Sequence, residues 1–98
     1  MIKHIVLFRV TDSDNRDKES TTETLAGIFS PLEKLEWVKS YRLGINISTS
    51  ENAWDVVIDS EFESLEDLEA YSVSAEHKKA ISDASVIKKE KCVIDYQF

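Results

Sequence analysis

The first ten residues constrain the fold most, because they form a predicted β-strand that is apolar on both faces. The segment 1–10 contains no turn residue. Side chains alternate between the two faces of a strand. One face carries Ile2, His4, Val6, Phe8 and Val10, and the other carries Lys3, Ile5, Leu7 and Arg9. A strand that is apolar on both sides must be covered on both sides. The rest of the chain offers helices for one side only, so we expect a second copy of the chain to cover the other.

Length and charge exclude several classes of protein. The chain has 98 residues, which predicts one domain over 1–98. Its net charge of −7 disfavours nucleic acids and anionic membranes as partners, because both attract cationic surfaces. No apolar run approaches the ~20 residues of a membrane span. The N-terminus lacks the apolar segment of a signal peptide, so we expect a cytoplasmic protein. The single Cys92 excludes an internal disulfide and a cysteine-rich metal site, and alternation predicts a buried free thiol in the last strand.

Hydrophobic periodicity predicts the remaining elements. Apolar residues at helical spacing predict a helix from about residue 17, capped by Ser13 or Asp14 and ended or restarted by Pro31, with a short extra turn through residue 35. Alternation predicts strands at 37–48, 53–62 and 88–98, the first two paired as a hairpin through a turn at 49–52. Gly44 inside the first of these suggests a bulge or a close approach.

Two serines mark the starts of the other helical segments. Ser64 begins a capping box, and the helix that follows reaches about residue 71. Ser74 is a second N-cap, after which the helix continues. The resulting order β-α-β-β-α-β predicts a ferredoxin-like α+β fold, in which two helices cover one face of a four-stranded antiparallel sheet. Two such sheets stacked on their open faces would form a dimeric α+β barrel.

The two histidines of the chain are the main candidates for chemistry. His4 shares a face of the first strand with Val6 and Phe8, and His77 lies six residues after Tyr71, near a helix start. In a ferredoxin-like fold the first strand is central and the second helix packs over the sheet, so both imidazoles could reach one cavity. We expect Val6, Phe8 and Ile81 to line it. A neutral imidazole accepts a proton near pH 7, and a phenol can position a carbonyl group. Burial and a helix N-terminus would both lower the pKa of His77.

Structural roles are the alternative interpretation of the same residues. His4 could be a hydrogen-bonded core residue, His77 an exposed helix residue and Tyr71 a half-buried core aromatic. The acidic run over 61–69 is typical of a solvated helix face rather than of a glycosidase carboxylate pair. The sequence contains no phosphate-binding loop, dinucleotide fingerprint, nucleophile elbow or zinc signature. We therefore expect no metal and no cofactor.

Three segments resemble the stress-response A/B barrel (Dabb) family, the dimeric α+β barrel proteins. They are Lys-His-Ile-Val-Leu-Phe at 3–8, Tyr-Ser-Val-Ser-Ala-Glu-His at 71–77 and Cys-Val-Ile-Asp-Tyr at 92–96. The resemblance implies a homodimer with a β-barrel at its centre. Family members include plant stress proteins, bacterial proteins of unknown role and a plant polyketide cyclase that closes a linear polyketide by aldol condensation. The catalytic roles of that cyclase would fall on Tyr71 and His77, with His4 lining the pocket. The family often has His-Pro where this chain has Ser74-Ala75.

These observations leave two main functional hypotheses. The first is a small homodimeric binding protein with a pocket for an apolar molecule that bears a carbonyl group. The second is a cofactor-free cyclase, isomerase or lyase, with His77 as general base, Tyr71 as its partner and His4 as an orienting or acidic group. A cofactor-free monooxygenase of the wider dimeric barrel superfamily is a third hypothesis, and it rests on analogy alone.

Overall fold

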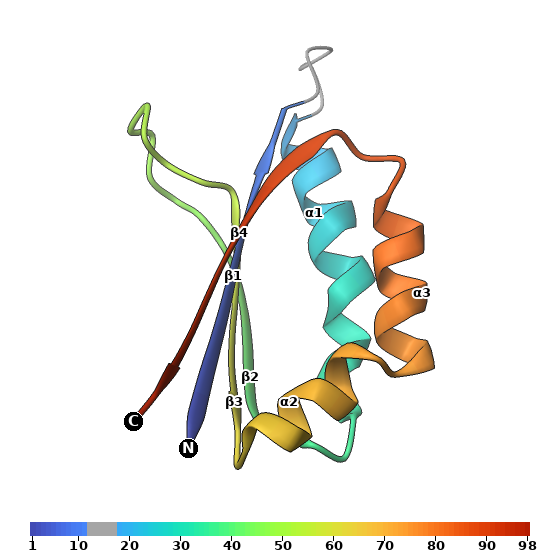
Figure 1. The fold of residues 1–98 in the computed structure, drawn as a ribbon. Helices are drawn as coiled ribbons and strands as arrows, with labels where there is room; N and C mark the ends of the chain where they lie inside the picture. Colours follow the sequence, from blue (N-terminus) through green and yellow to red (C-terminus); the bar gives the residue numbers. More distant parts are fainter. Residues whose placement is uncertain (12–17) are drawn as a thin grey trace.

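The structure, a computed structural model, describes residues 1–11 and 18–98 and has one sheet with helices on one side (Figure 1). The strands are β1 (Ile2–Val10), β2 (Val38–Ile45), β3 (Val56–Phe62) and β4 (Lys89–Gln97). The helices are α1 (Lys18–Phe29), the 3₁₀ helix η2 (Ser30–Lys34), α2 (Leu65–Ser72) and α3 (Ala75–Ala84). This is the predicted ferredoxin-like α+β fold, with the second helical region divided into α2 and α3.

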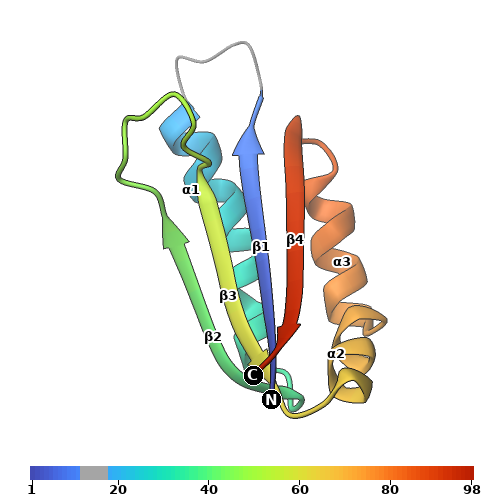
Figure 2. The same cartoon turned by 60° about the vertical axis from the view of Figure 1, so that its left-hand side comes forward.

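The sheet is antiparallel throughout, with the strand order β2-β3-β1-β4 seen face-on in Figure 2. The first strand is central, as predicted: Val6 lies opposite Ile58 of β3 and opposite Val93 of β4. Helices α1, α2 and α3 lie on the side of the sheet that carries His4, Val6 and Phe8. No helix or strand of the described residues covers the other side (Figure 1), and we call it the open face.

The core lies between the helices and the sheet. Its apolar side chains alternate along β1 and β3 and repeat at helical spacing along α1, as amphipathic strands and helices require. Its members include Val6, Phe8, Val56, Ile58, Phe62, Leu25, Phe29, Leu68 and Tyr71. Pro31 separates α1 from η2, as predicted, because a proline cannot donate the backbone hydrogen bond that would continue the helix.

The serine caps predicted from the sequence are present. The Ser64 hydroxyl accepts a hydrogen bond from the Asp67 amide at 3.1 Å, and the Ser74 hydroxyl accepts one from the His77 amide at 3.1 Å. Each cap satisfies one of the amide groups left free at a helix N-terminus. The cap predicted at Ser13 or Asp14 lies outside the described residues.

The connection between β2 and β3 is longer than predicted. The two strands pair as a hairpin, but they end at Ile45 and begin at Val56, so the prediction of strands at 37–48 and 53–62 was too long. The Asn46 backbone amide still donates to the Asp55 carbonyl at 2.9 Å. Its side chain donates to the Trp54 carbonyl and accepts from the Ser48 amide, so side-chain hydrogen bonds compete with the ladder beyond this pair.

Two further details of the sheet differ from expectation or refine it. The register shift in β2 lies between Val38 and Ser40 rather than at Gly44. Gly44 instead marks a close approach, since a Cβ there would lie 3.2 Å from the Val57 side chain. Cys92 was predicted to be buried, but in the single chain it is only half-buried, because it lies on the open face of β4 opposite Leu7.

Candidate functional site

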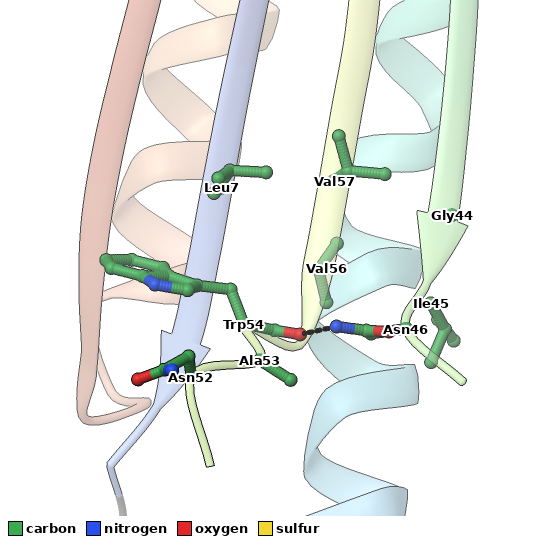
Figure 3. Close-up of a pocket in the computed structure, with 9 residues that line it drawn as sticks. All are labelled: Leu7, Gly44, Ile45, Asn46, Asn52, Ala53, Trp54, Val56 and Val57. Atoms are coloured by element: carbon green, nitrogen blue, oxygen red, sulfur yellow. Dashed lines mark hydrogen bonds between the residues drawn. The ribbon is translucent and has the colours of Figure 1, made fainter. Parts of the chain in front are cut away.

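Two hollows in the surface are candidates for a site, and their linings differ. The first is on the open face at the β2–β3 connection (Figure 3) and has a volume of about 370 Å³. Leu7, Val57 and Gly44 form its floor and Trp54 one wall. Asn46 and Asn52 are the polar side chains in its lining, and none of the lining residues titrates near neutral pH. Acid–base chemistry therefore has no candidate group there.

The second hollow is a cavity of about 260 Å³ between the helices and the sheet, which we call the histidine cavity. The sheet and all three α-helices contribute to its lining, which consists of His4, Val6, Phe8, Phe29, Ile58, Tyr71, Ser72, His77, Ile81 and Lys91. The six site residues predicted from the sequence are all in this list. The structure thus brings together in one cavity residues that are up to 87 positions apart along the chain.

Aromatic rings pack against both imidazoles. The ring centroid of Tyr71 lies 4.9 Å from that of His77 and 6.2 Å from that of His4, both in edge-on geometry. The ring of Phe62 packs against that of Tyr71, with 5.0 Å between the two ring centroids. Edge-to-face contacts of this kind hold rings in fixed orientations. Tyr71 therefore contacts both imidazole rings and helps to fix their orientations.

Ser74 holds the segment that joins Tyr71 to His77. Its hydroxyl donates to the Tyr71 carbonyl at 2.8 Å while it accepts from the His77 amide at 3.1 Å. Ser74 is 9% exposed, so these bonds are largely shielded from water. The cap predicted as a helix start thus also fixes the relative placement of the two ring-bearing residues, and Ser74 is a positioning residue.

In addition to its ring contacts, His4 forms a hydrogen bond with Asp95, which was not predicted as part of the site. The two strands place His4 and Asp95 directly opposite each other, and Nδ1 of the imidazole is hydrogen-bonded to the carboxylate. A carboxylate at Nδ1 fixes the orientation of the imidazole ring and turns Nε2 away from Asp95. Alternation could have placed Asp95 on the helix-facing side of β4, but only the register of β1 with β4 makes it the partner of His4.

Burial lowers the pKa of His77, and the charge of Lys91 and the proximity of His4 add to the effect. A hydrogen bond to the backbone of Ser72 acts in the opposite direction. The lowered pKa keeps His77 neutral at pH 7. The alternative of a fully exposed His77 is wrong, because its ring lines the cavity and packs on Tyr71.

The phenol of Tyr71 is buried, and burial raises its pKa to about 12. It therefore keeps its proton at neutral pH. Its hydroxyl interacts with that of Tyr41 in β2, whose own hydroxyl donates to the Phe29 carbonyl at 2.8 Å. Among the described residues, no hydrogen bond joins the Tyr71 hydroxyl to His77, so their contact is between rings.

Other kinds of site find less support in the structure. Within residues 1–11 and 18–98, no group of three or more histidine, cysteine or acidic side chains could hold a metal ion. No helix in the same ranges is long and apolar enough to cross a membrane. The neutral imidazole of His77 beside the protonated phenol of Tyr71 in a largely apolar cavity suits a ligand with a polarised carbonyl group.

The fold and this cavity define the class of protein: a ferredoxin-like α+β domain with a histidine-lined cavity between helices and sheet. A sequence profile described as the Stress responsive A/B Barrel Domain, Dabb, matches residues 2–98. The chain belongs to this family. A comparison with curated proteins gives no match.

Solved structures with the same fold include proteins of unknown function and an enzyme. A dimeric ferredoxin-like protein of unknown function from Bacteroides fragilis is 25% identical, with a TM-score of 0.81 over 99% of this chain and 95% of that one. A dimeric ferredoxin-like protein of unknown function from Thermobifida fusca is 19% identical, with a TM-score of 0.81 over 99% and 90%. A hydroxynitrile lyase from Passiflora edulis is 14% identical, with a TM-score of 0.69 over 97% and 90%.

Proposed function

We propose that this chain is a single-domain homodimeric binding protein that holds a small apolar molecule with a carbonyl group in the histidine cavity. The observation that carries the proposal is the meeting of His4, Tyr71 and His77 in one cavity with apolar walls. A volume of about 260 Å³ is just below the usual range of about 300–1,000 Å³ for ligand pockets, so the ligand is small.

The exposed apolar side chains of the open face are the evidence for the proposed homodimer. Ile94, Tyr96 and Phe98 are 57%, 48% and 58% exposed in the single chain, and they adjoin Ile5 and Leu7 on the same side of the sheet. A contiguous apolar surface of this kind marks an interaction site. Dimeric relatives with this fold support a second copy as the partner, and a self-complementary face is what a two-fold dimer requires.

A ligand screen by thermal shift tests the binding proposal. Aromatic ketones and aldehydes are added to the wild type, to His77→Ala and Tyr71→Phe, and to the control Leu65→Ala. Leu65 is 62% exposed and does not line the cavity, so its variant should respond as the wild type does. We expect hits whose shift is reduced in the two cavity variants. Equal shifts in all four proteins would contradict a shared site.

A cofactor-free enzyme is the second candidate, and the His4–Asp95 pair favours it. The neutral imidazole of His77, beside a second imidazole that a carboxylate orients, is suited to proton abstraction next to a carbonyl. In such a step His77 takes the proton from the carbon, the C–H electron pair moves into the enolate, and the protonated phenol of Tyr71 is the neighbouring donor. The hydroxynitrile lyase among the neighbours supports the fold alone at its 14% identity.

Deuterium exchange distinguishes an enzyme from a binding protein without knowledge of the natural substrate. The α-protons of a ketone that binds are followed by NMR in D₂O. An enzyme should accelerate their exchange, and His77→Gln should lose about 10²-fold or more of that rate, as expected for a general base. Binding without accelerated exchange would leave the binding protein as the function.

A further inference from the structure

The lining of the histidine cavity includes a lysine, Lys91, and neither the binding function nor the enzymatic function proposed above gives it a role. Lys91 of β4 lies opposite Phe8 and belongs to the cavity lining. None of the ion pairs between described residues involves Lys91. The charge of Lys91 is close enough to lower the pKa of His77, so a cation lies near the ligand space.

The charge of the lining is opposite to that of the whole chain. The net charge is −7, yet the described residues that line the cavity include no aspartate or glutamate. Asp95, the nearest acidic residue on this side of β4, is hydrogen-bonded to His4. Glu76 and Asp83 of α3 line a different hollow. These three acidic residues are therefore engaged with His4 or line another hollow.

We propose that Lys91 binds an anionic group of the ligand, so that the ligand is a small carbonyl compound with a carboxylate. This inference rests on the proposed function and narrows its ligand class. The carbonyl part occupies the space between Val6, Phe8 and Ile81, where the walls are apolar. The carboxylate lies toward Lys91, which is exposed at the surface and can follow the ligand with its flexible side chain.

A matched pair of probes tests the inference. The compounds 4-acetylbenzoate and 4-acetylbenzamide have the same shape, but only the first is charged at pH 7. Affinities are measured by NMR titration of the ring signals of His77 and Tyr71 in the full chain. We expect the carboxylate to bind about fivefold more tightly than the amide, the upper range for a partly exposed ion pair.

Variants assign the preference to one residue. Lys91→Met should abolish the preference for the carboxylate, whereas Lys91→Arg should keep it. Lys88→Met is the matched control, because Lys88 is exposed, lies just before β4 and is absent from the cavity lining. This control changes the net charge by the same amount and should keep the full preference.

Each outcome has a distinct meaning. If neither probe moves the His77 and Tyr71 signals of the wild type, the binding function proposed for the cavity is contradicted. If both probes bind with equal affinity, that function stands and the inference about the anion is overturned. If the preference persists in Lys91→Met, Lys91 is not its source and the inference is again overturned.

Discussion

The replacement Ile94→Ala tests whether the open face is a dimer interface. Ile94 lies opposite Ile5 on the open-face side of the edge strand β4 and is 57% exposed in the single chain. Full burial of an isoleucine side chain is worth about 1.5–3 kcal/mol, so burial of this exposed part contributes about 1–1.5 kcal/mol per copy. A two-fold dimer contains the residue twice. The variant should therefore lose about 2–3 kcal/mol of association free energy, which corresponds to a roughly 30- to 150-fold higher dimer Kd.

Sedimentation velocity over a concentration series measures this Kd directly. Val86→Ala is the matched control, because Val86 is 84% exposed and lies in the connection before β4, outside the open face. The control should dissociate as the wild type does. A wild-type chain that is fully folded and monomeric at micromolar concentration would refute the reasoning, and so would equal Kd values for the two variants.

Four other predictions concern the histidine cavity and its support. The pKa of His77 should rise in Lys91→Met, because a neighbouring positive charge is removed; NMR titration measures it. Since the pKa of His77 is lowered in the folded chain, its contribution to stability should be present above about pH 6.5 and be lost as the pH falls below that value. Ser74→Ala should lower the free energy of unfolding by about 1 kcal/mol, measured by urea denaturation, whereas Ser85→Ala, at an exposed helix end, should cost less than about 0.5 kcal/mol. The pKa of Tyr71 is raised to about 12, so stability should fall as the pH rises from about 10 toward 12, and Tyr71→Phe should reduce that slope in alkaline denaturation curves.

Local signals predicted the elements well wherever one physical effect dominated. Ser64 and Ser74 correctly predicted the starts of α2 and α3, because a serine hydroxyl accepts a hydrogen bond from a free amide at the helix start. Pro31 breaks the first helix because it has no amide proton to donate. The segment 46–55 was predicted less well, because its side chains compete with the ladder for backbone hydrogen bonds and alternation does not report that competition.

The candidate site was predictable in its members but not in its contacts. Their positions made His4, Tyr71 and His77 candidates, the resemblance to the Dabb family implied their roles, and the fold brings them into one cavity. The roles of Asp95 and Lys91 were not indicated, because each depends on the register of β1 with β4. A shift of that register by one residue would turn both side chains to the open face.

The sequence by itself determined which faces of the strands are apolar, where the helices begin and which chain segments resemble one family. Those properties depend on neighbours within a few residues, and such neighbours are fixed by the covalent chain. Only the tertiary structure decided that the Asp95 carboxylate meets the imidazole of His4, that Tyr71 packs on both histidine rings and that Lys91 belongs to the lining of a largely apolar cavity. These contacts join residues from opposite ends of the chain, and their energies exist only once strand pairing and helix packing have brought the ends together.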